Sequence, residues 1–120
     1  IDRINDRVTY LYEPLHPAVL RMIRQVVEIG HRAGIHVDMC GEMAGDPAYT
    51  MILLALELDE LSMNPLAIPK VKEIVRATTL REAKQLMNKI MKMSSAVEIR
   101  EVVEKTMREK FPDIFSGNGH

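Results

Sequence analysis

Two short segments of alternating apolar and polar residues, each placed between helical segments, limit the folds open to this chain. The first spans residues 35–39 and follows Gly34, and the second spans 58–63 and ends at Asn64-Pro65. Strands that alternate with helices favour parallel βα units. A two-stranded sheet is marginal on its own. We therefore expect an α/β fold that is incomplete, with most strands of its parallel sheet missing.

Helix signals fill most of the remaining chain. Apolar residues recur at three- and four-residue steps, prolines stand at first helical positions, and two Ser/Thr-x-x-Glu capping boxes occur. The first expected helix begins at Pro17 and ends just before Gly34, a typical residue beyond a helix end. The others cover 47–56, 69–77, 80–93 and 96–110, with a loop at 41–45 and a flexible tail at 112–120. Residues 51–56 are apolar almost all round, so we expect them either to be largely buried or to pack on a partner.

Composition excludes several classes of function. The chain has 16 basic and 17 acidic residues, so it lacks the basic excess of nucleic-acid-binding proteins. No apolar run reaches the ~20 residues of a membrane-spanning helix. A single cysteine excludes an internal disulfide and a four-cysteine zinc site, and it fits a reducing compartment. His16, His31 and His36 have no metal-ligand spacing, so we interpret them as structural and expect no metal ligands in this chain.

Cys40 has two readings from its position alone. It ends the first predicted strand, and catalytic groups of barrel enzymes stand at the carboxyl ends of strands. A small buried hydrophobic residue is the commoner fate of a free cysteine, and position alone favours that reading. From its position near the start of the sequence alone, we interpret Arg3 as a solvated surface charge. Gly41 and Gly45 read as turn residues and Asp46 as a helix N-cap.

The segment Met39–Pro47 (MCGEMAGDP) closely resembles the active-site loop of Enzyme I of the bacterial sugar phosphotransferase system, the phosphoenolpyruvate–protein phosphotransferases. Asp2-Arg3, residues 11–20 (LYEPLHPAVL) and residues 58–63 (LDELSM) resemble the same family in the same order. The related pyruvate phosphate dikinases and phosphoenolpyruvate synthases share Cys-Gly-Glu but typically continue with His, where this chain has Met43. The chain departs from the family at Ile4 and Asp38, where the family often has small residues.

The resemblance implies a C-terminal fragment of the phosphoenolpyruvate-binding domain, which in the family is a (β/α)8 TIM barrel. Residues 1–78 would be βα units with the active-site loop at 39–47, and 79–111 the terminal helices. By the same resemblance, Cys40 is the proton donor to C3 of the enolate, and Arg3 binds the phosphoryl group of the substrate. Glu42 stays unassigned.

The resemblance also implies cofactors and partners. The family's magnesium ligands precede residue 1, so we expect magnesium in the intact enzyme, no metal ligand here and no activity from the fragment alone. The intact enzyme would be cytoplasmic. It would pass the phosphoryl group of phosphoenolpyruvate to its own histidine and on to the histidine-containing phosphocarrier protein, starting sugar uptake and leaving pyruvate.

A non-catalytic module that associates with itself is the competing hypothesis. In a quarter of a barrel, two apolar faces would lose their cover: Leu20, Ile23 and Val27 on one helix, and Ile52, Leu54 and Leu56 on another. Exposure would cost about 1.5–3 kcal/mol for each side chain. We therefore expect a homodimer that buries these faces, or else collapse of helices 80–110 onto them.

Overall fold

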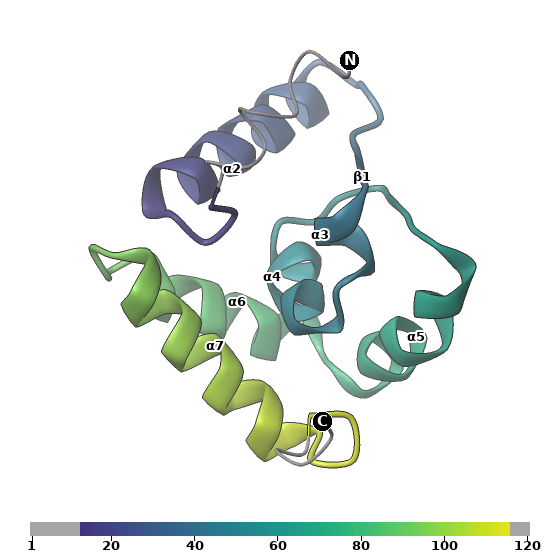
Figure 1. The fold of residues 1–120 in the computed structure, drawn as a ribbon. Coiled ribbons are helices and arrows are strands. Elements are labelled where there is room, and N and C mark those ends of the chain that lie inside the picture. The colour runs from purple at the N-terminus through teal and green to yellow at the C-terminus, as the bar shows by residue number, and fades with distance from the viewer. Residues whose placement is uncertain (1–12, 116–120) are drawn as a thin grey trace.

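The computed structural model describes residues 13–115, so Arg3 lies outside the described residues. Its helices and strands follow one another as the sequence predicts, with an additional short helix after the first strand (Figure 1). They are α2 (Pro17–Arg32), β1 (Asp38–Cys40), α3 (Glu42–Gly45), α4 (Thr50–Ala55), β2 (Glu60–Ser62), α5 (Ile68–Ala77), α6 (Leu80–Ile90) and α7 (Ala96–Lys110), with 3-10 helices at Pro47–Tyr49 and Pro65–Ala67.

The two strands pair in parallel, which confirms the α/β expectation. Asp38 faces Glu60, Met39 faces Leu61, and Cys40 faces Ser62. Both strands are shorter than predicted. The first residues expected in β1 instead close helix α2: Gly34 adopts a positive φ of 74°, and the Ile35 amide donates to the Gly30 carbonyl at 2.8 Å. This bond pattern is a Schellman helix terminator.

Helix α4 forms the centre of the core, between α6 and α5 (Figure 1). The two apolar faces that were expected to need cover are largely buried within the chain itself. Leu20, Val27, Ile52 and Leu56 are buried, and Ile23 and Leu54 are half-buried against the core. Helix α6 packs against α4 and so covers the face with Ile52 and Leu56, which agrees with the alternative that helices 80–110 collapse onto the apolar faces.

The predicted loop at 41–45 is also wrong, because residues 42–45 form helix α3. Gly41 turns the chain with a positive φ of 86°, and Met43 and Ala44 then enter the core. The helix predicted at 47–56 is divided: a 3-10 turn precedes α4. The Asp46 carboxylate accepts the Ala48 amide at 3.0 Å, so Asp46 is the predicted N-cap.

The terminal helices follow their capping signals. Thr79 and Glu82 form the complete predicted capping box at the start of α6. At α7, Ser95 accepts the Glu98 amide as predicted, but the Glu98 carboxylate accepts the Ser94 amide instead of that of Ser95. Helix α6 ends at Ile90, earlier than the expected residue 93, because Met91 caps it and the chain then turns.

The predicted tail at 112–120 is folded for its first residues. The Ile114 and Phe115 amides donate to the Phe111 carbonyl at 3.0 Å, and both side chains pack on the core. Residues 116–120 lie outside the described residues. Across the described part of the chain, no helix combines the length and the apolar character that crossing a bilayer requires.

Candidate active site

Cys40 is the last residue of β1, and its side chain is exposed to solvent. Alternation along the strand explains this exposure. Met39 and Leu61 pack on the core, whereas Asp38, Cys40, Glu60 and Ser62 share the opposite, exposed face of the two-stranded sheet. The thiol therefore stands at the carboxyl end of a parallel strand and is not a buried structural cysteine.

The turn after Cys40 brings the chain back against the other strand. Gly41 turns the chain with a positive φ. A residue with a side chain would adopt this conformation only at a cost of ~1 kcal/mol or more. A Cβ on Gly45 would lie 3.1 Å from Met63 Cβ, so this position is confined by the residue that follows β2. The close approach at Gly45 is thus between two protein segments.

A pocket of about 770 Å³ opens at the ends of both strands. Its lining comes from the α3 segment and from the segment after β2: Cys40, Gly41, Glu42, Gly45, Asp46, Ser62, Met63, Asn64 and Ala67. Open α/β sheets bind ligands outside the carboxyl ends of their strands, and TIM barrels carry their active sites at that end. The pocket occupies this position, and Cys40 contributes an exposed thiol to its lining.

A second hollow of about 500 Å³ also reaches Cys40. Pro14 and Tyr49 also line this hollow, and Glu42 and Asp46 line both it and the first pocket. The thiol therefore borders two hollows.

Two polar side chains of the pocket lining, Asp46 and Asn64, are engaged in local structure. Asp46 caps the 3-10 helix after α3, and the Asn64 side-chain oxygen accepts the Leu66 amide at 2.9 Å in the same way after β2. Within residues 13–115, the only grouping of three His, Cys, Asp or Glu ligand atoms is His36, Asp38 and Glu60, away from the pocket lining.

The sequence places Cys40, Gly41, Gly45 and Asp46 in one segment, and the structure adds one residue of the second strand and one that follows it. Ser62 is the register partner of Cys40, and Asn64 lines the same pocket. Register between the strands cannot be read from a segment of three residues. The repeated Asx-Pro signal at Asp46-Pro47 and Asn64-Pro65 was the available indication that both strands end in similar turns.

Comparison with known proteins adds a family. Residues 1–80 match the family described as PEP-utilising enzyme, PEP-binding domain. The phosphoenolpyruvate-protein phosphotransferase of Buchnera aphidicola subsp. Schizaphis graminum is 42% identical over 105 residues, which are 88% of this chain and 18% of that protein. The same-named protein of Haemophilus influenzae is 38% identical over 109 residues, 91% of this chain and 19% of that protein.

The phosphoenolpyruvate-protein phosphotransferase of Staphylococcus carnosus is 40% identical over 104 residues, which are 87% of this chain and 18% of that protein. This chain thus spans less than a fifth of the length of these curated relatives. These matches show that the chain belongs to the PEP-utilising enzymes and that its residues 1–80 are part of their PEP-binding domain.

Proposed function

We propose that this chain is the C-terminal part of the (β/α)8 barrel domain of a phosphoenolpyruvate–protein phosphotransferase, with Cys40 as the general acid. The observation that carries the proposal is the exposed Cys40 thiol at the end of β1, on a 770 Å³ pocket. Its exposed strand face, with Asp38, Cys40, Glu60 and Ser62, would face the barrel interior, since the opposite face packs on helices.

The reaction needs one proton at carbon. When the phosphoryl group leaves phosphoenolpyruvate for an enzyme histidine, the P–O bond breaks and the enolate of pyruvate remains. The thiol of Cys40 gives its proton to C3 of that enolate, which forms the C–H bond of pyruvate and leaves a thiolate. Exposure of Cys40 lets water restore the proton. The phosphorylated histidine then passes its phosphoryl group to the histidine-containing phosphocarrier protein of a cytoplasmic sugar-uptake system.

Arg3 would bind the phosphoryl group. A guanidinium offers a planar fork of donors to phosphate oxygens, and charge stabilisation is the main requirement of phosphoryl transfer. The family's magnesium would be held by residues of the intact domain outside this chain. One arginine and one cysteine cannot neutralise both a phosphate and an enolate, so we expect the 120-residue chain alone to release no pyruvate.

The structure also bears on the two alternatives. A pyruvate phosphate dikinase or phosphoenolpyruvate synthase typically has His at position 43, and here Met43 is buried in the core and lines the second hollow. This apolar position favours the phosphotransferase. The second alternative, a module that associates with itself, is compatible with the surface of helix α2. On that helix Met22, Val26 and Ile29 form an apolar row, and their side chains are 55%, 56% and 56% exposed. We propose that this row is the homodimer contact.

Kinetics of the full-length protein test the role of Cys40. In Cys40→Ala, turnover should fall by about 10²–10⁴-fold while phosphoenolpyruvate binding is unchanged, because a proton donor acts in the chemical step. Cys40→Ser should also be impaired, since a hydroxyl is a much weaker acid than a thiol. A raised Michaelis constant with unchanged turnover would instead assign Cys40 to substrate binding.

A further inference from the structure

The pocket at the carboxyl ends of the strands has an acidic side and a neutral side. The segment after β1 contributes the carboxyl groups of Glu42 and Asp46, whereas β2 and the segment after it contribute the side chains of Ser62 and Asn64. No lysine or arginine of residues 13–115 lines the pocket. Because nearby carboxylates repel an anion, an anionic molecule in this pocket is favoured beside Ser62 and Asn64.

Both sides of this pocket are built by the chain itself. The segment after β1 lies against the segment after β2, where a Cβ on Gly45 would come within 3.1 Å of Met63 Cβ. Ser62 is the register partner of Cys40, and Asn64 lies two residues beyond it. Neighbouring strands are ~4.8 Å apart, so one small molecule can contact both the Cys40 thiol and the Asn64 side chain.

The turn after β2 fixes the orientation of the Asn64 side-chain amide. The backbone amide of Leu66 donates to Asn64 Oδ1 at 2.9 Å. Because only the oxygen of a side-chain amide accepts such a bond, the contact distinguishes Oδ1 from Nδ2. Within residues 13–115, the two donors of Nδ2 make no hydrogen bond. Asn64 therefore brings a neutral pair of donors to the pocket lining.

Formation of this turn does not by itself require an amide. Asp46 starts a similar turn after β1, and its carboxylate accepts the Ala48 amide at 3.0 Å. Aspartate and asparagine are about equally good in this capping position. What Asn64 has that an aspartate would lack is the Nδ2 donor and the absence of a negative charge, and both favour an anion in the pocket.

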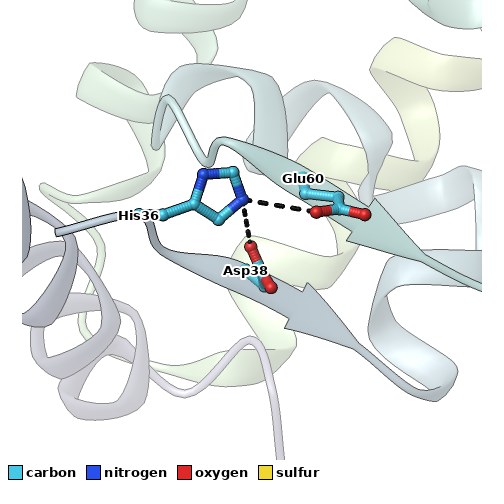
Figure 2. Close-up of side chains that lie close together, drawn as sticks. All are labelled: His36, Asp38 and Glu60. Atoms are coloured by element: carbon cyan, nitrogen blue, oxygen red, sulfur yellow. Dashed lines mark hydrogen bonds and ion pairs between the residues drawn. The ribbon is translucent and has the colours of Figure 1, made fainter.

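The polar side chains at the other end of the strands are already paired with one another. His36 Nε2 lies 2.8 Å from Asp38 Oδ1 and 3.3 Å from Glu60 Oε1 (Figure 2). These three groups satisfy one another and do not call for a ligand. Asn64 differs from them because its donors are at the pocket and its acceptor alone is used by the fold.

We propose that Asn64 Nδ2 binds the carboxylate of phosphoenolpyruvate. This inference rests on the proposed function, in which Cys40 protonates C3 and Arg3 binds the phosphoryl group. C2 of the substrate carries three groups, which are the C3 methylene, the phosphoryl oxygen and the carboxylate. The first two have partners in that proposal, and the carboxylate is the one that remains. A contact with Asn64 holds the carboxylate on the β2 side and C3 near the thiol on the β1 side, so Asn64 binds substrate and takes no part in proton transfer.

Kinetics of the full-length Asn64→Asp variant test this contact. The aspartate keeps an oxygen for the Leu66 amide, so the turn and the melting temperature should be preserved, but a negative charge replaces the donor. The Michaelis constant for phosphoenolpyruvate should rise by at least about tenfold, with a smaller change in turnover at saturation. Inhibition by pyruvate, which keeps the carboxylate, should weaken by a similar factor, and inhibition by inorganic phosphate should weaken much less.

The matched control is Asn88→Asp, which makes the same exchange at an exposed position of α6 outside the pocket lining. Its Michaelis constant should equal that of the parent. The contact is overturned if phosphate inhibition weakens as much as pyruvate inhibition, because Asn64 would then act on the phosphoryl group. An active parent whose Asn64→Asp variant keeps the parent's Michaelis constant overturns the contact alone. A full-length parent that releases no pyruvate from phosphoenolpyruvate overturns the proposed function and the contact with it.

Discussion

Both oxygens of the Glu13 carboxylate lie 2.7 Å from Nη2 of Arg100, although 87 residues separate the two in the sequence. Glu13 Oε2 also accepts the Leu15 amide at 3.1 Å. This contact ties the segment before α2 to helix α7. Pro14, the next residue, forms a wall of the second hollow at Cys40, so the terminal helix supports the proposed active site.

Replacement of Arg100 by Gln should lower stability modestly. Both side chains of the pair are more than a third exposed, so the loss is limited to about 1 kcal/mol, or a melting temperature lower by about 4 °C. Arg100→Lys keeps the charge and should lose less. Thermal unfolding of the three proteins measures this, and equal melting temperatures for Arg100→Gln and the parent would contradict it.

The effect of Arg100→Gln should depend on pH. Partial burial raises the pKa of Glu13, but the Leu15 amide and the hydrogen bond and charge of Arg100 outweigh it, so the pKa lies below its usual 4.5. A carboxyl group whose pKa is lower in the folded than in the unfolded protein stabilises the fold at pH values above its unfolded-state pKa. This contribution is lost as the pH falls through the folded-state pKa. The difference between parent and variant should thus be full at pH 7 and vanish in acid; a constant difference would exclude this cause.

Replacement of Glu57 by glycine should make the protein more stable. It follows α4 with a positive φ of 59°, a conformation that costs a side-chain-bearing residue ~1–2 kcal/mol. Glu57→Gly should raise the free energy of unfolding by about 0.5–1 kcal/mol, despite losing an exposed ion pair with Lys84. Glu57→Ala loses the same pair and keeps the strain, so it should be less stable than the parent. Denaturant unfolding decides, and an alanine variant as stable as the glycine variant would refute the strain.

The Cys40 thiol should react with a thiol-specific dye under native conditions. The residue is exposed at the strand end, and it is the only cysteine of the chain, so the signal is unambiguous. The native rate should lie within about tenfold of the rate in denaturant, as for an accessible thiol. Cys40→Ser is the blank. Labelling that requires unfolding would show that the pocket is closed to small molecules.

The homodimer proposal concerns helix α2. Val26→Glu places a charge in the middle of the exposed apolar row and should shift sedimentation equilibrium at tens of micromolar from dimer to monomer. Val97→Glu makes the same change at an exposed valine of α7 and should leave the dimer intact. A monomeric parent chain, or dissociation by both variants alike, would contradict α2 as the contact.

Signals that act within a few residues predicted much of this fold. The caps at Asp46 and Thr79, the terminator at Gly34 and the parallel βα order could all be read from the sequence. Helix α3 could not, because it depends on burial of Met43 and Ala44 against distant elements.

Contacts between distant segments were predicted only in part. The packing of α6 on α4 was one of two alternatives for covering the apolar face of residues 52–56, whereas the convergence of His36 with Glu60 depends on strand register, which the sequence did not indicate. For the candidate site, the loop sequence identified Cys40. Its neighbours Ser62 and Asn64 required the pairing of β1 with β2. The proposed contribution of Arg3 stays a prediction, since that residue is outside the described range.

The stereochemistry of proton addition tests the role of Cys40 most directly. The full-length protein would turn over phosphoenolpyruvate with deuterium at one C3 position in tritiated water, and the handedness of the resulting methyl group of pyruvate would be measured. A donor fixed at the end of β1 protonates one face of the enolate, so the parent should give one handedness. Cys40→Ala should give a mixture of both, as water protonates the enolate after its release. A product of single handedness from Cys40→Ala would contradict Cys40 as the proton donor.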